Sequence, residues 1–161
     1  MFNEKNNITR VLVVCMGNIC RSPTMEAVLL AKAKRAGLDI EVDSAGTTSY
    51  HQGERPDKRS QAAGIMRGYD FSHIRARQIS VNDYVNFDLI LCADKSNQRE
   101  VLALCPPSLE SKVGLFLEYG DMGYAEVPDP YYGGEQGFEL VLDLVENAAD
   151  GLIKKLRLSE Q

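Results

Sequence analysis

The chain has 161 residues, 44% of them hydrophobic, so it is long enough to bury a core, and its length predicts one domain over residues 1–161. Its formal net charge of −5 argues against a nucleic-acid binder, because such proteins need a basic surface to displace counterions. The first seven residues are polar and no later apolar run is long enough for a bilayer, so we expect no signal peptide, no membrane span and a cytoplasmic location.

The four cysteines indicate neither a disulfide scaffold nor a metal centre. Cys15 and Cys20 are separated by four residues, Cys92 and Cys105 by twelve, and the chain has only two histidines. Zinc sites typically use two closely spaced pairs of ligands, which this pattern lacks. We therefore expect no metal ligands and no cofactor, and a reducing compartment that suits a reactive thiol.

An apolar run over residues 11–14 leads directly into Cys15 and a loop that ends at Arg21, Ser22 and Pro23. The run is typical of a buried strand, and Ser22 as N-cap before Pro23 predicts the start of a helix. The loop then lies at a helix N-terminus, where free N–H groups and the helix dipole favour an anion. A thiol in that field would lose its proton easily.

The residues of this loop suit a tetrahedral oxyanion with the Cys15 sulfur below it as nucleophile. The Arg21 guanidinium pairs with two phosphate oxygens, Gly17 allows close backbone approach, and Asn18 tolerates a left-handed conformation. A cysteine and an arginine at this spacing also occur by chance, but the strand before and the helix start after them favour a functional loop. The predicted phosphate-binding residues are Met16, Gly17, Asn18, Ile19, Cys20, Arg21 and Ser22.

Strand and helix patterns alternate along the rest of the chain. A helix from Pro23 should stop at Gly37, and Asp94 should be the N-cap of a later helix. Further strands are predicted over 40–43, 87–93 and 112–117, and further helices over 58–67, 96–104 and 138–156. This order predicts an α/β fold, a parallel sheet with helices on both faces and an active crevice beyond the carboxyl ends of the strands.

The segment from Cys15, Cys-x-Gly-Asn-Ile-Cys-Arg-Ser-Pro, resembles the phosphate loop of low-molecular-weight protein tyrosine phosphatases. Residues 43–47, 72–78, 94–97 and 129–133 resemble the later signatures of that family in their usual order, so the resemblance covers nearly the whole chain. It implies a three-layer fold with a small four-stranded parallel sheet, a phosphotyrosine-containing protein as substrate, a phosphate or other oxyanion in the site, and a phosphocysteine intermediate.

Such a reaction needs a group that protonates the leaving oxygen. Asp129 begins an Asp-Pro-Tyr-Tyr-Gly turn that could carry a carboxyl group over a pocket, but Asp121 lies on the same long loop and spacing does not choose between them. The resemblance favours Asp129, because the family's general acid occupies that position. The implied catalytic residues are therefore Cys15, Arg21 and Asp129, with Asp129 later acting as the base for water.

The resemblance also implies roles outside the loop. Tyr131, Tyr132 and Tyr50 would line a slot for a flat aromatic ring, whose depth would select phosphotyrosine over phosphoserine. The alternative for each of these tyrosines is ordinary anchoring of a loop.

A second implied group consists of polar residues that support the loop. Ser44, His73 and Asp94, together with Asn18, resemble positions where hydrogen bonds hold the loop in shape, although a core or capping role fits them equally well from the sequence alone. Cys20 could form a disulfide with Cys15 that protects the nucleophile from further oxidation, in which case a Cys20→Ala variant should recover poorly from peroxide.

Two other classes of function share part of this pattern. Arsenate reductases of one type have this fold and loop, but they use a closely spaced downstream cysteine pair, whereas Cys92 and Cys105 are thirteen positions apart. A module that binds phosphotyrosine without turnover would be expected to lack the nucleophile or the acid. Arsenate-dependent consumption of thiol would identify the first class, and the absence of product release the second.

Overall fold

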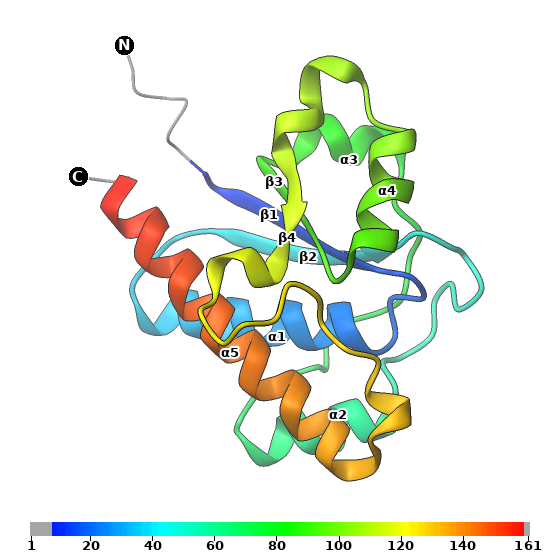
Figure 1. Ribbon diagram of the computed structural model, residues 1–161, viewed down its shortest axis with the longest axis vertical. Coiled ribbons are helices and arrows are strands. Elements are labelled where there is room, and N and C mark those ends of the chain that lie inside the picture. Colours follow the sequence, from blue (N-terminus) through cyan, green and yellow to red (C-terminus); the bar gives the residue numbers. More distant parts are fainter. Residues whose placement is uncertain (1–7, 160–161) are drawn as a thin grey trace.

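The computed structural model describes residues 8–159, and its centre is a sheet of four parallel strands (Figure 1). The strands are β1 (Arg10–Cys15), β2 (Glu41–Gly46), β3 (Leu89–Cys92) and β4 (Val113–Leu115). Their order across the sheet is β2-β1-β3-β4, and every neighbouring pair runs parallel. The predicted α/β architecture and the parallel sheet are confirmed.

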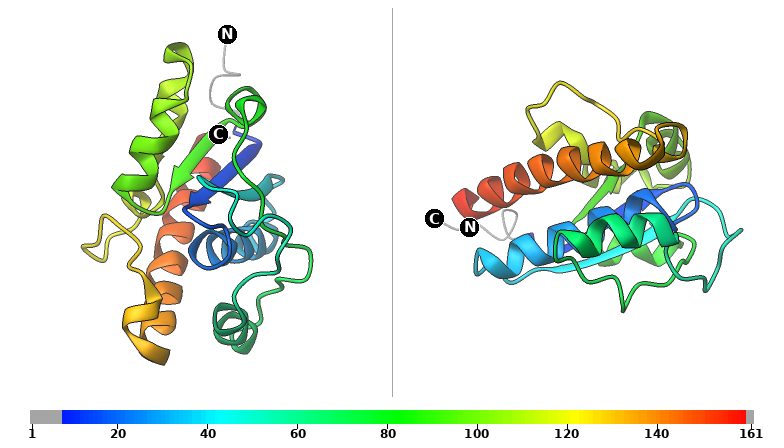
Figure 2. Two further views of the ribbon diagram at one scale, coloured as in Figure 1. Left: turned by 90° about the vertical axis from the view of Figure 1, so that its right-hand side faces the viewer. Right: turned by 90° about the horizontal axis from the view of Figure 1, so that it is seen from below.

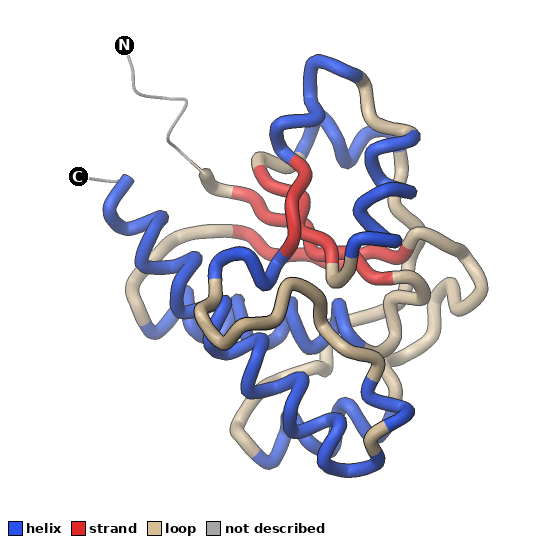
Figure 3. The backbone as a smooth tube through the Cα atoms, viewed as in Figure 1, coloured by secondary structure: helices blue, strands red, loops and turns tan. Residues whose placement is uncertain are grey.

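Helices cover both faces of the sheet, so the fold has three layers, with the strands in the middle (Figures 2 and 3). The helices are α1 (Arg21–Arg35), α2 (Lys58–Met66), α3 (Val81–Asn86), α4 (Lys95–Ala103) and α5 (Gly134–Ser159). α1 and α5 pack together on one face, while α3 and α4 lie over the other. α2 packs against α5 and α1.

The two faces of β1 explain this layering. Val11 and Val13 belong to the apolar core shared with α1 and α5, whereas Leu12 and Val14 belong to the core beneath α3 and α4. All four side chains are completely buried, as a strand in the interior of a parallel sheet requires. The continuous apolar run in the sequence is thus the consequence of helices on both sides.

Most predicted elements are present, with differences at their ends. Gly37 follows α1 with a φ of +72°, which confirms the predicted stop. The prediction of Ser22 as N-cap is wrong: α1 begins at Arg21 with Cys20 as N-cap, so Ser22 lies inside the first turn. α3 was not predicted, because six residues are too few to show a helical period. α5 begins at Gly134, four residues before the apolar period that predicted it.

The sheet order places a crevice at the carboxyl end of β1. From β1 the chain continues to β2 on one side, while β3 lies on the other side, so this is the point at which the strand order reverses. Ligands of open α/β folds bind at such a point.

Within residues 8–159, no helix is both long and apolar enough to cross a membrane. The cytoplasmic location stays a prediction, and the polar first seven residues lie outside the described part.

Candidate active site

Cys15 is the last residue of β1, and its side chain lies at the N-terminus of α1. Its Sγ is 3.1 Å from the Ser22 hydroxyl oxygen and accepts a hydrogen bond from the Ser22 backbone N–H at 3.4 Å. Because α1 starts at Arg21, the positive end of its dipole also points toward the sulfur. This environment places the sulfur directly below the position that an anion bound at the helix N-terminus would occupy.

Asn18 holds the loop in a left-handed turn. Its φ is +58°, and its side chain is buried. The Nδ2 group donates hydrogen bonds to the hydroxyl oxygens of Ser22 at 2.8 Å and Ser44 at 3.0 Å, and Oδ1 accepts one from the Arg77 backbone N–H at 3.0 Å. The Asn18 amide therefore ties the loop to β2 and to the chain at Arg77.

Glu26 extends these contacts to the surface and was not predicted from the sequence. The Ser44 hydroxyl donates to Glu26 Oε1 at 2.6 Å, and the second carboxylate oxygen is 3.1 Å from His73 Nε2. Burial raises the pKa of the Glu26 carboxyl. The signal that could have found Glu26 is a charged residue in the first turns of α1, where the neighbouring positions are buried. We call this set of six residues the web: Cys15, Ser22, Asn18, Ser44, Glu26 and His73.

Arg21 is fixed by groups from the opposite side of the crevice. Its Nη1 donates to Asp94 Oδ2 at 2.8 Å and to the Val127 carbonyl oxygen at 3.0 Å. Asp94 also caps α4 by accepting from the Asn97 N–H at 2.7 Å, as its predicted N-cap role requires. Burial acts to lower the pKa of Arg21, but the negative charges of Cys15, Asp94 and Asp129 raise it overall, so the guanidinium stays charged.

A cavity of about 280 Å³ opens above the loop. Asp129 lines the same cavity as Cys15, and its Oδ1 accepts a hydrogen bond from the Tyr131 N–H at 2.9 Å. Asp121 lies elsewhere, where its backbone and carboxylate bind the Asn147 amide of α5. The lining residues are Cys15, Met16, Gly17, Ile19, Cys20, Arg21, His51, Asp129, Pro130 and Tyr131.

Residues 10–161 match the family model of the low molecular weight phosphotyrosine protein phosphatases. The chain belongs to this family. A putative low molecular weight protein-tyrosine-phosphatase of Synechocystis is 46% identical over 91% of this chain and 96% of its own length. The enzyme is thus a protein-tyrosine-phosphatase, a phosphoric monoester hydrolase, as the resemblance implied.

Solved structures of the family superpose closely on this phosphatase. A protein tyrosine phosphatase from Entamoeba histolytica, with Hepes in its active site, has a TM-score of 0.90 at 40% identity, covering 95% of this chain and 99% of that one. Wzb of Vibrio vulnificus, in complex with benzylphosphonate, has a TM-score of 0.82 at 28% identity, covering 92% and 99% of the two chains.

The three predicted specificity tyrosines have different surroundings in the phosphatase. Tyr131 lines the cavity, and its hydroxyl donates to Asp57 Oδ2 at 2.9 Å. Tyr50 is 82% exposed and does not line the cavity, whereas its neighbour His51 does. Tyr132 lies in the short 3-10 turn Pro130–Tyr132, but its side chain is outside the described part.

Cys20 shares the cavity with Cys15, and both are free thiols. The Cys20 Sγ is 3.1 Å from the Ser60 hydroxyl oxygen, and burial raises its pKa to about 12. The protective disulfide between Cys15 and Cys20 stays a prediction.

Among residues 8–159, no three His, Cys, Asp or Glu side chains are grouped so that they could hold a metal ion.

Proposed function

We propose that this phosphatase hydrolyses phosphotyrosine in proteins, and simple aryl phosphates, through a phosphocysteine formed on Cys15. The observation that carries the proposal is the cavity shared by Cys15, Arg21 and Asp129. A nucleophile, a cation for the phosphate oxygens and a proton donor are the three groups that such a reaction needs. They come from β1, the first turn of α1 and the segment before α5.

In the first step the Cys15 thiolate attacks phosphorus, so that an S–P bond forms while the bond to the leaving oxygen breaks. Asp129 donates its proton to that oxygen, and the dephosphorylated part of the substrate leaves as a phenol. Arg21 and the N–H groups of the loop bind the three remaining oxygens, on which negative charge develops in the transition state. Asp94 supports this step by fixing the Arg21 guanidinium.

In the second step a water molecule attacks the phosphocysteine. Asp129, now a carboxylate, takes the proton of the water, the S–P bond breaks, and inorganic phosphate is released. The electron pair returns to sulfur, where the Ser22 hydroxyl and N–H stabilise the thiolate. The web keeps these donors in place, which assigns Asn18, Ser44 and His73 a supporting role.

An aromatic substrate fits the walls of the cavity. Tyr131 and His51 present flat rings beside the loop residues that would hold the phosphate. The benzylphosphonate bound by the Vibrio vulnificus relative also carries an aromatic ring near a tetrahedral phosphorus. Tyr50 and Tyr132 remain candidates for contacts with the rest of a phosphoprotein.

Hydrolysis of p-nitrophenyl phosphate in excess EDTA at mildly acidic pH tests the proposal. Wild-type protein should release nitrophenol without added metal, and Cys15→Ser should lose nearly all of this activity because a hydroxyl is a poor nucleophile at that pH. Equal turnover by Cys15→Ser would contradict the assignment of the nucleophile. Absence of turnover by the wild type would favour the redox class of function, and arsenate reduction would then be assayed.

A further inference from the structure

The start of α2 reaches across to the segment that contains Asp129. Asp57 is the N-cap of α2, and its Oδ1 accepts hydrogen bonds from the backbone N–H groups of Arg59 at 2.8 Å and Ser60 at 3.2 Å. Its other oxygen, Oδ2, accepts a hydrogen bond from the Tyr131 hydroxyl at 2.9 Å. One carboxylate therefore both caps a helix and holds a side chain 74 positions later in the sequence.

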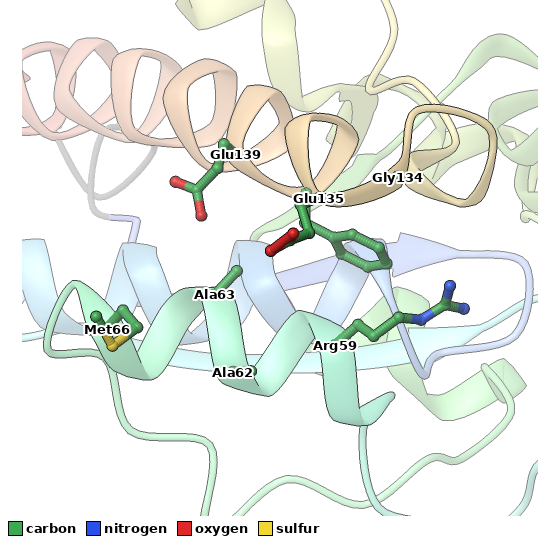
Figure 4. A pocket seen from close by; sticks show the side chains of 8 residues that line it. Arg59, Ala62, Ala63, Met66, Gly134, Glu135 and Glu139 are labelled. Atoms are coloured by element: carbon green, nitrogen blue, oxygen red, sulfur yellow. The ribbon is translucent and has the colours of Figure 1, made fainter.

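Arg59 contacts the face of the same tyrosine ring. The Arg59 guanidinium lies 4.6 Å from the centre of the Tyr131 ring and 5.2 Å from that of Phe138 in α5. The two rings meet edge to face at 6.1 Å. In Figure 4, Arg59 extends from α2 toward the start of α5, at one end of the cavity between these helices. The Tyr131 ring is thus fixed by three contacts from two helices.

These contacts continue to both halves of the active site. The Tyr131 N–H donates to Asp129 Oδ1 at 2.9 Å, so a fixed Tyr131 also fixes the carboxyl group two residues before it. In the other direction, the Asp57 N–H donates to the Ile19 carbonyl oxygen of the phosphate loop at 2.6 Å. Asp57 consequently connects the loop of the nucleophile with the segment of the proposed acid.

We propose that Asp57 and Tyr131 form a latch that positions Asp129 for proton transfer. This inference rests on the proposed function, in which Asp129 is the general acid. Asp57 and the Tyr131 hydroxyl are positioning groups, since they act on the reaction through Asp129. Without the latch, Asp129 spends less time within reach of the leaving oxygen, whereas Cys15 and Arg21 keep their own contacts.

The test compares substrates whose leaving groups need a proton to different degrees. Tyr131→Phe removes one oxygen and keeps the ring between Arg59 and Phe138. For each variant we would measure kcat/KM, which reports formation of the phosphocysteine, with phenyl phosphate and with 2,4-dinitrophenyl phosphate. Phenolate is a poor leaving group and dinitrophenolate a good one. Tyr131→Phe should lower kcat/KM for phenyl phosphate roughly tenfold more than kcat/KM for the dinitrophenyl ester. This is less than the roughly 10²–10⁴-fold contribution of a general acid, because the variant keeps Asp129.

Two further variants serve as controls for this test. Tyr124→Phe changes an exposed tyrosine away from the site and should leave the ratio of the two substrates at its wild-type value. Asp129→Asn should change the ratio more than Tyr131→Phe does. An unchanged ratio in Tyr131→Phe, with the expected change in Asp129→Asn, would overturn the latch alone. An unchanged ratio in Asp129→Asn would overturn the acid assignment, and the latch with it.

Discussion

At the scale of single residues, Asn18 has the most demanding position in the phosphate loop. It combines a backbone conformation that L-residues rarely adopt with three side-chain hydrogen bonds in a buried place. The two contributions can be separated, because glycine tolerates the conformation without making the bonds.

Asn18→Gly should lower the free energy of unfolding by about 2–4 kcal/mol, since buried partners such as Ser22 and Ser44 lose a donor. Asn18→Ala should lower the free energy of unfolding by about 1 kcal/mol more than Asn18→Gly does, because alanine is also strained at a positive φ. Both variants should lose most of their activity. Urea unfolding of the three proteins measures the difference, and equal stability of the Gly and Ala variants would show that the backbone of residue 18 is not strained.

Glu26 makes the stability of the fold depend on pH. Burial raises the pKa of its carboxyl in the folded protein above the ordinary value of 4.5, so the folded state holds the proton more tightly than the unfolded chain. The stability due to this group is present below the unfolded pKa and is lost as the pH rises through the folded pKa.

Glu26→Gln should remove this dependence, because the amide stays neutral. The stability of the variant relative to wild type should therefore increase with pH over a range that begins near pH 4.5 and ends above the folded pKa, by about 1.4 kcal/mol for each pH unit that separates the two pKa values. Urea unfolding over this range is the measurement, with Glu100→Gln on the exposed side of α4 as control. A constant difference between Glu26→Gln and wild type would contradict a raised pKa.

At the scale of elements, the site is assembled from the ends of β1, α1 and α4. β1 supplies the nucleophile, the first residue of α1 supplies the guanidinium, and the N-cap of α4 supplies the carboxylate that holds it. Asp94 therefore has two functions, one in the stability of α4 and one in the orientation of Arg21.

Asp94→Asn and Asp94→Ala separate these functions. Asparagine is as good an N-cap as aspartate but carries no charge, so the Ala variant should be about 1 kcal/mol less stable than the Asn variant. Both should reduce kcat/KM for p-nitrophenyl phosphate roughly tenfold, the size expected when a charge-assisted hydrogen bond is lost. Full activity of Asp94→Asn would show that the charge of Asp94 does not position Arg21.

At the scale of the whole molecule, the fold gives its cysteines different reactivity. Burial raises the pKa values of Cys20 and Cys92 to about 12, and that of Cys105 above its ordinary value. Those three thiols therefore stay protonated at neutral pH, whereas the Cys15 sulfur lines the cavity beside the N-terminus of α1.

Iodoacetamide at neutral pH should consequently modify Cys15 first, and inorganic phosphate should slow that reaction by occupying the loop. Mass spectrometry of the labelled peptides measures both effects. Labelling spread evenly over the four cysteines, or labelling of Cys15 that phosphate leaves unchanged, would contradict this description of the site.

The sequence was sufficient for those parts of the fold that depend on neighbours along the chain. The apolar run of β1, the stop at Gly37 and the cap at Asp94 are local patterns, and all three are confirmed. Glu26 and Asp57 were missed because their partners, His73 and Tyr131, are far away in sequence. No local pattern records such contacts, which arise only when α1, α2 and the segment before α5 pack together.

The most direct test of the account is to trap the intermediate. Wild-type protein, Cys15→Ser and Asp129→Asn would each be mixed with excess 2,4-dinitrophenyl phosphate, quenched in alkaline denaturant within the first turnovers and digested for mass spectrometry. We predict the added mass of one phosphoryl group on the peptide that contains Cys15, at higher occupancy in Asp129→Asn because this variant lacks the base for the second step, and none in Cys15→Ser. Turnover by the wild type with no phosphoryl group on that peptide, or with the group on another residue, would contradict the account.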